Sequence, residues 1–197
     1  RCRDTMGRWM ITDACGTPPE GVPVSNYTFA VGNNGVTRYE FLYEVKELAV
    51  VIASHDPFTF TPNPKYLSEL QPRLRDRVAT RLQVENIAQN LDPDSLLTDF
   101  HTLDRGAPIV GPDMMVESGN GRVMALRLAA DVFPQKYGVY QEQLIMRAED
   151  FGQKASDIEE LLLPVLVRVR TTAVDRRAFT QEANTPVAFS PSAIEQA

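Results

Sequence analysis

The chain has 197 residues, of which 43% are hydrophobic and 23% are charged, and its formal net charge is −6. This length suits one medium domain, and the acidic balance excludes a uniformly basic nucleic-acid-binding coat while leaving a local basic patch open. No apolar run approaches the roughly 18 residues of a membrane span, so no membrane partner is expected. Two cysteines and two histidines argue against a disulfide scaffold and a structural zinc site, and a reducing cytoplasm fits this composition best.

The first elements predicted along the chain are an irregular lead-in and a β-hairpin. Residues 1–25 are rich in glycine and proline and contain one short predicted strand at 9–11. Residues 27–31 and 36–45 are rich in aromatic and β-branched side chains, and the Gly-Asn-Asn-Gly sequence at 32–35 separates them. This arrangement is typical of two antiparallel strands joined by a tight turn.

An arginine-rich helix is predicted after a further short apolar run at 47–53. Apolar side chains at helical spacing indicate a helix that begins near Arg73 and stops before Pro93. Four arginines fall within nine residues at its start, either as contacts for the phosphates of a nucleotide or of DNA, or as a solvated helix face. These arginines are Arg73, Arg75, Arg77 and Arg81.

The centre of the chain predicts a small hairpin followed at once by a helix. Two short apolar runs, 108–110 and 114–116, stand on either side of a Gly-Pro-Asp turn. From about 122 to 132 the apolar residues recur at spacings of three and four, which indicates one buried helix face. The residues of that face are Val123, Leu126, Ala130 and Phe133.

The junction between the hairpin and this helix is the predicted site. Gly119 and Gly121 flank Asn120, so the backbone can adopt φ > 0 and a ligand can approach the free N–H groups of the helix start. The helix dipole and Arg122 both attract negative charge, which favours a phosphate pocket. The alternative is a glycine turn with a solvated arginine.

Helices and one central strand are predicted beyond a loop at 92–107. Helices are expected at 140–151 and 156–163, the second with Ser156 and Glu159 as a capping box. The continuous apolar pattern of 164–170 predicts a strand in the middle of a sheet, and 173–183 predicts a short helix.

Three segments, in this order, resemble the nucleotide-binding domain of the ParB/sulfiredoxin superfamily. They are Ile52 to Asp56 with Asn63-Pro64 and Gln71-Pro72-Arg73; Pro108-Ile109-Val110 with Gly119-Asn120-Gly121-Arg122 and Ala125; and Leu163 to Val167 with Glu182-Ala183-Asn184 and Ser190 to Ala197. The His-Asp-Pro opening at 55–57 and the Gly-Asn-Gly-Arg variant at 119–122 look most like the ddrB-like ParB branch found in large multidomain proteins of phages and plasmids.

The resemblance implies an α+β fold with a small mixed sheet flanked by helices. Residues 44–197 would form the nucleotide-binding domain, and residues 1–43 an N-terminal extension that carries the β-hairpin. The expected function is a nucleotide-binding switch in a DNA-associated protein. Its partners would be a nucleotide, non-specific DNA, and either a second copy of the chain or further domains of a larger one.

The resemblance also implies a set of site residues. The nucleotide, with CTP favoured, its Mg²⁺ and DNA would each be bound by one group of residues. The nucleotide-binding residues are Gly119, Asn120, Gly121, Arg122, Asn184 and Arg73; the metal would lie near Glu182 and Asn184; DNA would meet Arg75, Arg77 and Arg81. Asn120 occupies the position of the catalytic cysteine of sulfiredoxin, and an amide cannot replace that nucleophile.

Two other functions stay open. A metal-dependent nucleoside triphosphatase or nuclease needs a carboxylate to hold the metal or orient water; the candidates are Glu117, Glu182 and Asp56, although Glu117 can equally be a surface residue at a strand end. The second alternative is an interaction module of a larger polyprotein with a degenerate pocket. Partition proteins carry Glu at the position of Asn120 and Arg at that of Gly121, and both losses favour this alternative.

Overall fold

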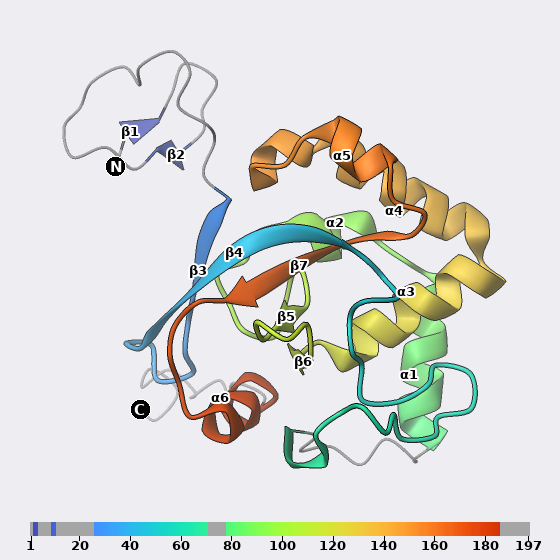
Figure 1. Ribbon diagram of the computed structural model, residues 1–197, viewed down its shortest axis with the longest axis horizontal. Helices are drawn as coiled ribbons and strands as arrows, with labels where there is room; N and C mark the ends of the chain where they lie inside the picture. The colour runs from blue at the N-terminus through green and yellow to red at the C-terminus, as the bar shows by residue number, and fades with distance from the viewer. Residues whose placement is uncertain (1, 4–8, 11–25, 71–77, 186–197) are drawn as a thin grey trace, which may run out of the picture.

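A five-stranded mixed sheet forms the centre of the structure (Figure 1). The computed structural model describes residues 2–3, 9–10, 26–70 and 78–185. Within these ranges the strands are β1 (Cys2–Arg3), β2 (Trp9–Met10), β3 (Tyr27–Val31), β4 (Arg38–Glu47), β5 (Ile109–Val110), β6 (Val116–Ser118) and β7 (Pro164–Arg170). β1 and β2 form a separate antiparallel pair, and the main sheet has the order β3-β4-β7-β5-β6.

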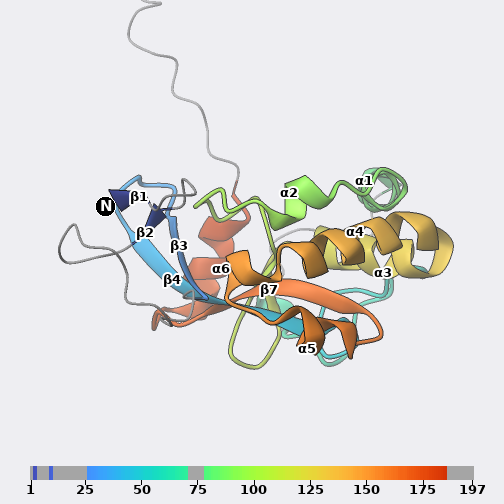
Figure 2. The ribbon, with the colours of Figure 1, turned by 90° about the horizontal axis from the view of Figure 1, so that it is seen from above.

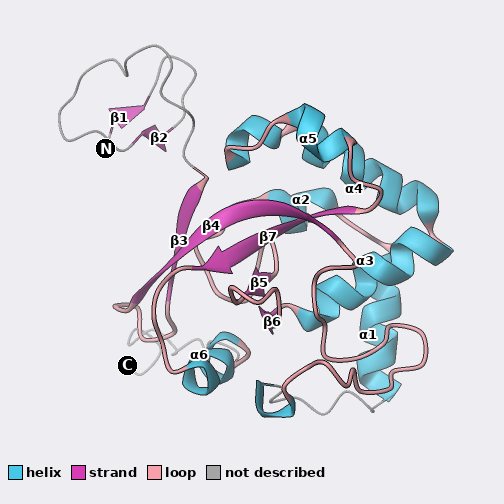
Figure 3. Cartoon of the chain, in the orientation of Figure 1, coloured by secondary structure: helices cyan, strands magenta, loops and turns pink. Residues whose placement is uncertain are grey.

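Helices surround this sheet, which confirms the predicted α+β class (Figure 3). The described helices are α1 (Val78–Gln89), α2 (Pro93–Leu97), α3 (Asn120–Val132), α4 (Pro134–Met146), α5 (Ala155–Glu159) and α6 (Arg176–Ala183), with short 3-10 turns η1 (Ser68–Leu70) and η2 (Ala148–Phe151). Figure 2 shows α1 to α4 gathered to one side of β4 and β7. The helices therefore cover the sheet unevenly and leave room for contacts at its edges.

Strand pairing confirms both predicted hairpins and the central place of β7. β3 pairs antiparallel with β4, and β5 pairs antiparallel with β6. Every residue of β7 is buried, and β7 lies antiparallel to β4 and parallel to β5. The parallel pair is possible because α3, α4 and α5 make the long crossover between the two strands. The division expected after residue 43 falls inside β4, which pairs with β7 from Phe41 to Glu47.

The main apolar core lies between the sheet and helices α3 and α4. In α3 the prediction of one buried face is too narrow, because α1 and α4 both pack against this helix. Its buried residues lie on more than one face, whereas Ala130 and Phe133 are only half-buried. The buried apolar residues of α3 are Val123, Met124, Ala125, Leu126, Leu128 and Ala129. The helix that begins at the glycine turn is therefore fixed on several sides.

Two local predictions are wrong, each because the residue that caps the helix is not the one expected. Residues 92–107 contain α2, which begins at Pro93 because Asp92 caps it by accepting from the N–H of Asp94. The cap of α5 is Lys154, so the predicted capping box does not form. The apolar run at 47–53 is no regular strand and contributes one isolated bridge, from Ile52 to Met115.

The last described helix is tied to the β3–β4 turn by Glu182. One carboxylate oxygen of Glu182 accepts from the backbone N–H of Asn33 at 2.8 Å, and the other accepts from the hydroxyl of Tyr39 at 2.6 Å. Burial, followed by the hydrogen bond to the carboxylate, raises the pKa of Tyr39 from 10.0 to about 12. Tyr39 therefore stabilises the structure only while it keeps its proton.

The Tyr39–Glu182 hydrogen bond predicts a loss of stability at alkaline pH. Because the folded-state pKa is the higher one, the contribution of Tyr39 is complete below pH 10.0 and is lost as the pH rises towards about 12. Urea unfolding at several pH values across this window should show a steeper loss of unfolding free energy in the native chain than in Tyr39→Phe. Parallel losses in the two proteins would contradict this role of Tyr39.

Candidate functional site

The predicted site is a sharp turn between β6 and α3. Gly119 caps the helix with φ 92° and ψ 24°, a left-handed conformation that favours glycine. The expectation of positive φ is wrong for Gly121, which lies in the first turn of α3 with ordinary helical geometry. The backbone N–H groups of this first turn have no partner within the helix. The turn therefore has the donors expected of an anion site, with Gly119 as the residue that shapes it.

Asn120 fixes this turn to the rest of the molecule. Its side chain is buried, with the carbonyl oxygen accepting from the N–H of Ser54 at 2.7 Å and the amide donating to the hydroxyl of Tyr66 at 3.2 Å. The same hydroxyl donates to the carbonyl of Val116 at 2.7 Å. The side-chain amide of Asn120 therefore holds the start of α3 in place. The backbone N–H groups of this helix start are the donors that a ligand could meet.

Arg122 folds back over the glycine turn. A Cβ atom added at Gly119 would meet the Nε and Nη2 atoms of Arg122 at 2.8 Å, so only glycine leaves room for this guanidinium. Its Nη1 atom donates to the carbonyl of Gly106. Burial and the nearby positive charge of Arg168 lower the pKa of Arg122. The guanidinium is thus held at the turn by neutral groups, in a place where an anion would favour its charge.

A second arginine lies behind the first. Arg168 of β7 is 1% exposed and donates to the carbonyls of Ala107 at 3.0 Å, Thr102 at 2.8 Å and Arg105 at 2.5 Å. Burial lowers its pKa, against the opposing influence of Tyr43 and nearby carboxylates. In the described part of the chain, neither Arg168 nor Arg122 forms an ion pair. Two guanidinium groups, one from α3 and one from β7, both donate to the loop before β5. They therefore create a positive field at the turn.

A cavity of about 270 Å³ opens at this turn, and we call it the turn cavity. It brings together four of the residues predicted to bind nucleotide, Gly119, Gly121, Arg122 and Asn184. The other residues that line it come from α1, α6, the strand end and the loop before β5, and sequence reasoning missed them all as site residues. They are Gln83, Ile87, Asp104, Ser118 and Ala183. Asp104 is exposed and supplies a carboxylate at the cavity wall.

Glu117 lies in a buried ionic cluster instead of at the surface, so the surface interpretation is wrong. It is 0% exposed and accepts two hydrogen bonds from Arg170, at 2.8 and 2.9 Å. Arg176 donates to it at 2.7 Å and also contacts Asp113 with two hydrogen bonds. Gly111 packs so closely that an added Cβ would meet this cluster at 2.6 to 2.9 Å. Two carboxylates and two guanidinium groups balance each other, which indicates a structural role.

Glu182 and Asn184, the predicted metal pair, have different surroundings. The carboxylate of Glu182 faces Asn33 and Tyr39, whereas the amide of Asn184 donates to the carbonyl of Glu117 at 2.8 Å and lines the turn cavity. Among the described residues, no group of three or more His, Cys, Asp or Glu side chains could hold a metal ion. The contacts give no support to a metal site made by Glu182 and Asn184 together.

The remaining predicted residues lie outside the turn cavity or outside the described structure. Asp56 holds a tight loop, since its carboxylate accepts from the N–H groups of Phe58 and Thr59. Arg81 is exposed on α1, with its guanidinium 4.9 Å from the ring centre of Phe60. The other three predicted arginines lie in the segment 71–77, outside the described residues. They are Arg73, Arg75 and Arg77.

Comparison with known families identifies this arrangement. Residues 34–171 match the family model described as the ddrB-like ParB superfamily domain. The chain belongs to this family. The match includes β4, the glycine turn of this ParB-like domain and β7, and it ends before α6, which supplies Asn184. Comparisons with curated proteins and with solved structures give no match. Within the described ranges, no helix is long and apolar enough to cross a membrane.

The buried cluster around Glu117 predicts a large loss of stability on neutralising this carboxylate. Glu117→Gln would leave Arg170 almost fully buried beside a neutral amide, so the free energy of unfolding should fall by about 3 kcal/mol or more. Asp113→Asn is the matched control, because Asp113 is half exposed and its loss should cost about 1 kcal/mol or less. Chemical unfolding measures both values. Equal and small effects would show that Glu117 has no structural role.

Proposed function

We propose that the turn cavity binds the phosphates of a nucleoside triphosphate. The observation that carries this proposal is the pair of guanidinium groups, Arg122 and Arg168, at a helix start capped by a left-handed Gly119. Each guanidinium is held by backbone carbonyls and not by a carboxylate; Arg122 lines the cavity, and the buried Arg168 contributes only its positive charge from behind the loop. The helix dipole and the free N–H groups of the first turn add to the same attraction.

Electrostatics favour a multiply charged ligand over a single weak anion. Burial lowers the pKa of Arg122 most, and repulsion from the positive charge of Arg168 lowers it further; a bound phosphate would offset both effects. Asp104 is the opposing charge at the cavity wall, and it is exposed, so water screens it. The two nearby carboxylates, Asp99 and Asp104, are both exposed and screened by water, whereas the two guanidinium groups are not, which leaves a net attraction for an anion.

The cavity size and the family suggest how a nucleotide would be held. Its volume of about 270 Å³ is near the lower end of ligand pockets, which begin at about 300 Å³. It suits a phosphate chain whose sugar and base remain outside the turn. CTP is the nucleotide that the resemblance favours, and the wider role would be a nucleotide-controlled switch in a DNA-associated phage or plasmid protein.

A magnesium ion would fit the turn cavity through Asp104. Mg²⁺ keeps several water ligands and usually takes one or two carboxylates together with substrate phosphates. Asp104 is the carboxylate that lines the cavity, whereas Glu182 faces the β3–β4 turn. The ion would neutralise phosphate charge. Because Glu117 is buried between two arginines, the lining residues support binding of the nucleotide and not its hydrolysis.

The first prediction from this proposal concerns Arg122. Arg122→Ala should weaken binding of CTP and of inorganic tripolyphosphate by about 1.5 to 3 kcal/mol, the scale of a charge-assisted hydrogen bond. Arg177→Ala is the control, because it removes the same charge from an exposed position on α6 outside the cavity. Isothermal calorimetry measures the affinities. An equal change in the two variants would show that net charge alone decides the affinity.

The second prediction concerns the glycine that shapes the turn. Gly119→Ala adds a Cβ in a left-handed conformation and places it within 3 Å of the Arg122 guanidinium, so phosphate affinity should fall about tenfold or more. Gly138→Ala is the matched control, since a Cβ at this helical position has no heavy atom within 4 Å. If calorimetry finds the same affinity for Gly119→Ala as for this control, Arg122 does not need the glycine to be positioned.

A further inference from the structure

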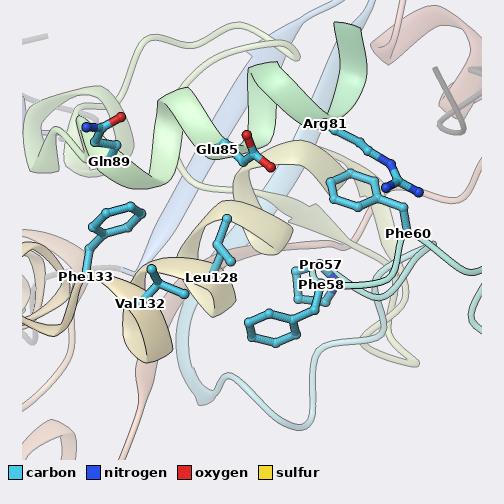
Figure 4. A pocket seen from close by; sticks show the side chains of 9 residues that line it. All are labelled: Pro57, Phe58, Phe60, Arg81, Glu85, Gln89, Leu128, Val132 and Phe133. Atoms are coloured by element: carbon cyan, nitrogen blue, oxygen red, sulfur yellow. The ribbon is translucent and has the colours of Figure 1, made fainter. Parts of the chain in front are cut away.

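A second hollow lies beside α1, and none of its residues lines the turn cavity (Figure 4). Its volume is about 360 Å³, and its lining includes Phe58, Phe60, Phe133, Arg81, Glu85 and Gln89. We call this surface the aromatic groove. Gln83 and Ile87 of α1 line the turn cavity, whereas the buried Val84 and Ala88 anchor the helix in the core. The groove is thus a separate site.

The aromatic wall of the groove is rigid and partly exposed. Asp56 accepts hydrogen bonds from the N–H groups of Phe58 and Thr59, at 2.9 and 2.7 Å, and its carbonyl accepts from the N–H of Phe60 at 3.0 Å. Phe60 has φ 59°, which is uncommon for a bulky residue and is maintained here by that loop. Phe58 is 52% exposed. A flat apolar ring is therefore held ready in contact with solvent.

Polar side chains form a row along the opposite wall. Arg81, Glu85 and Gln89 are spaced by four residues on α1, which places them on one face of the helix, as Figure 4 shows. Within the described structure, Glu85 and Gln89 make no side-chain hydrogen bond or ion pair. Arg81 donates to the carbonyl of Thr59 at 3.3 Å and lies over Phe60. The groove combines aromatic faces with an acceptor, an amide and a cation.

We propose that the aromatic groove binds an unpaired cytosine or adenine, the two bases with an exocyclic amino group where thymine and guanine have a carbonyl. Aromatic side chains stack on the exposed face of any base. The carboxylate of Glu85 accepts from an amino group, and the amide of Gln89 both donates and accepts, as these residues do at base edges. Thymine would bind less well, because it presents a carbonyl where the other two bases present an amino group. Arg81 would contact the attached phosphate.

Net charge supports a base-driven site. The chain carries a formal charge of −6, so non-specific attraction to a DNA backbone is weak. A base enters the groove only when it is unstacked, which excludes an intact double helix. The same chemistry is offered by a free nucleotide and by an unpaired base within a single strand, and the experiment distinguishes these two sources.

The test measures binding of fluorescein-labelled oligo-dC, oligo-dA and oligo-dT of about 12 nucleotides by fluorescence anisotropy. The native chain should bind oligo-dC and oligo-dA at least about fivefold more tightly than oligo-dT, and Phe58→Ala should weaken oligo-dC binding by a similar factor. Leu67→Ala is the matched control, because Leu67 is an apolar residue of similar exposure (46%) outside the groove. Equal affinity for the three oligonucleotides, or no binding, would overturn the proposal.

Two further measurements separate base recognition from other effects. Glu85→Gln should reduce the preference for oligo-dC over oligo-dT, whereas Glu142→Gln, an exposed position on α4, should leave it unchanged. Phe58→Ala should also bind inorganic tripolyphosphate as the native chain does, since Phe58 does not line the turn cavity. A preference that survives Glu85→Gln, or a loss of tripolyphosphate binding in Phe58→Ala, would overturn the assignment.

The source of the base follows from competition with dCMP. Displacement of labelled oligo-dC by dCMP would show that a free nucleotide fills the groove. Failure of dCMP to compete, with the preference for oligo-dC intact, would show that the groove needs a strand. Either result supports a nucleobase site, and neither depends on Arg122, so the groove can fail or succeed independently of the phosphate site.

Discussion

The turn cavity depends on the hydrogen bonds that the buried guanidinium of Arg168 donates to backbone carbonyls. A charge inside a protein is costly unless its N–H groups are paired, and Arg168 meets this requirement with three carbonyls of the loop before β5. That loop then presents the carbonyl of Gly106 to Arg122. Arg168 of the central strand thus fixes the loop. The loop in turn holds Arg122, and Arg122 closes the turn beside Gly119.

Two arginines of β7 differ in whether a carboxylate neutralises their charge. Arg168 and Arg170 are two residues apart on β7, so their side chains leave the same face of the sheet. Arg170 meets the carboxylate of Glu117, whereas Arg168 meets neutral carbonyls. The first pairing cancels charge and strengthens the structure near α6. The second leaves the charge of Arg168 without a carboxylate partner, behind the loop that also accepts from Arg122.

Helix α1 connects the two proposed sites. Its buried residues Val84 and Ala88 hold it in the core, while its remaining faces contribute to the turn cavity and to the aromatic groove. The two proposed sites therefore share one helix, although no residue of α1 lines both of them.

Local signals in the sequence determined the hairpin strands, the central strand β7, the glycine turn and the start of α3, because alternation, continuous apolar runs and turn residues act over a few neighbours. Only the tertiary structure decided that Gly119 and not Gly121 is left-handed, that Glu117 is buried between arginines, and that Asp104 faces the turn cavity. The role of Arg168 was the hardest to predict from the sequence, because its partners are carbonyl groups more than sixty positions away. Every residue has a backbone carbonyl whatever its side chain, so the sequence does not predict contacts of this kind and only the folded chain shows them.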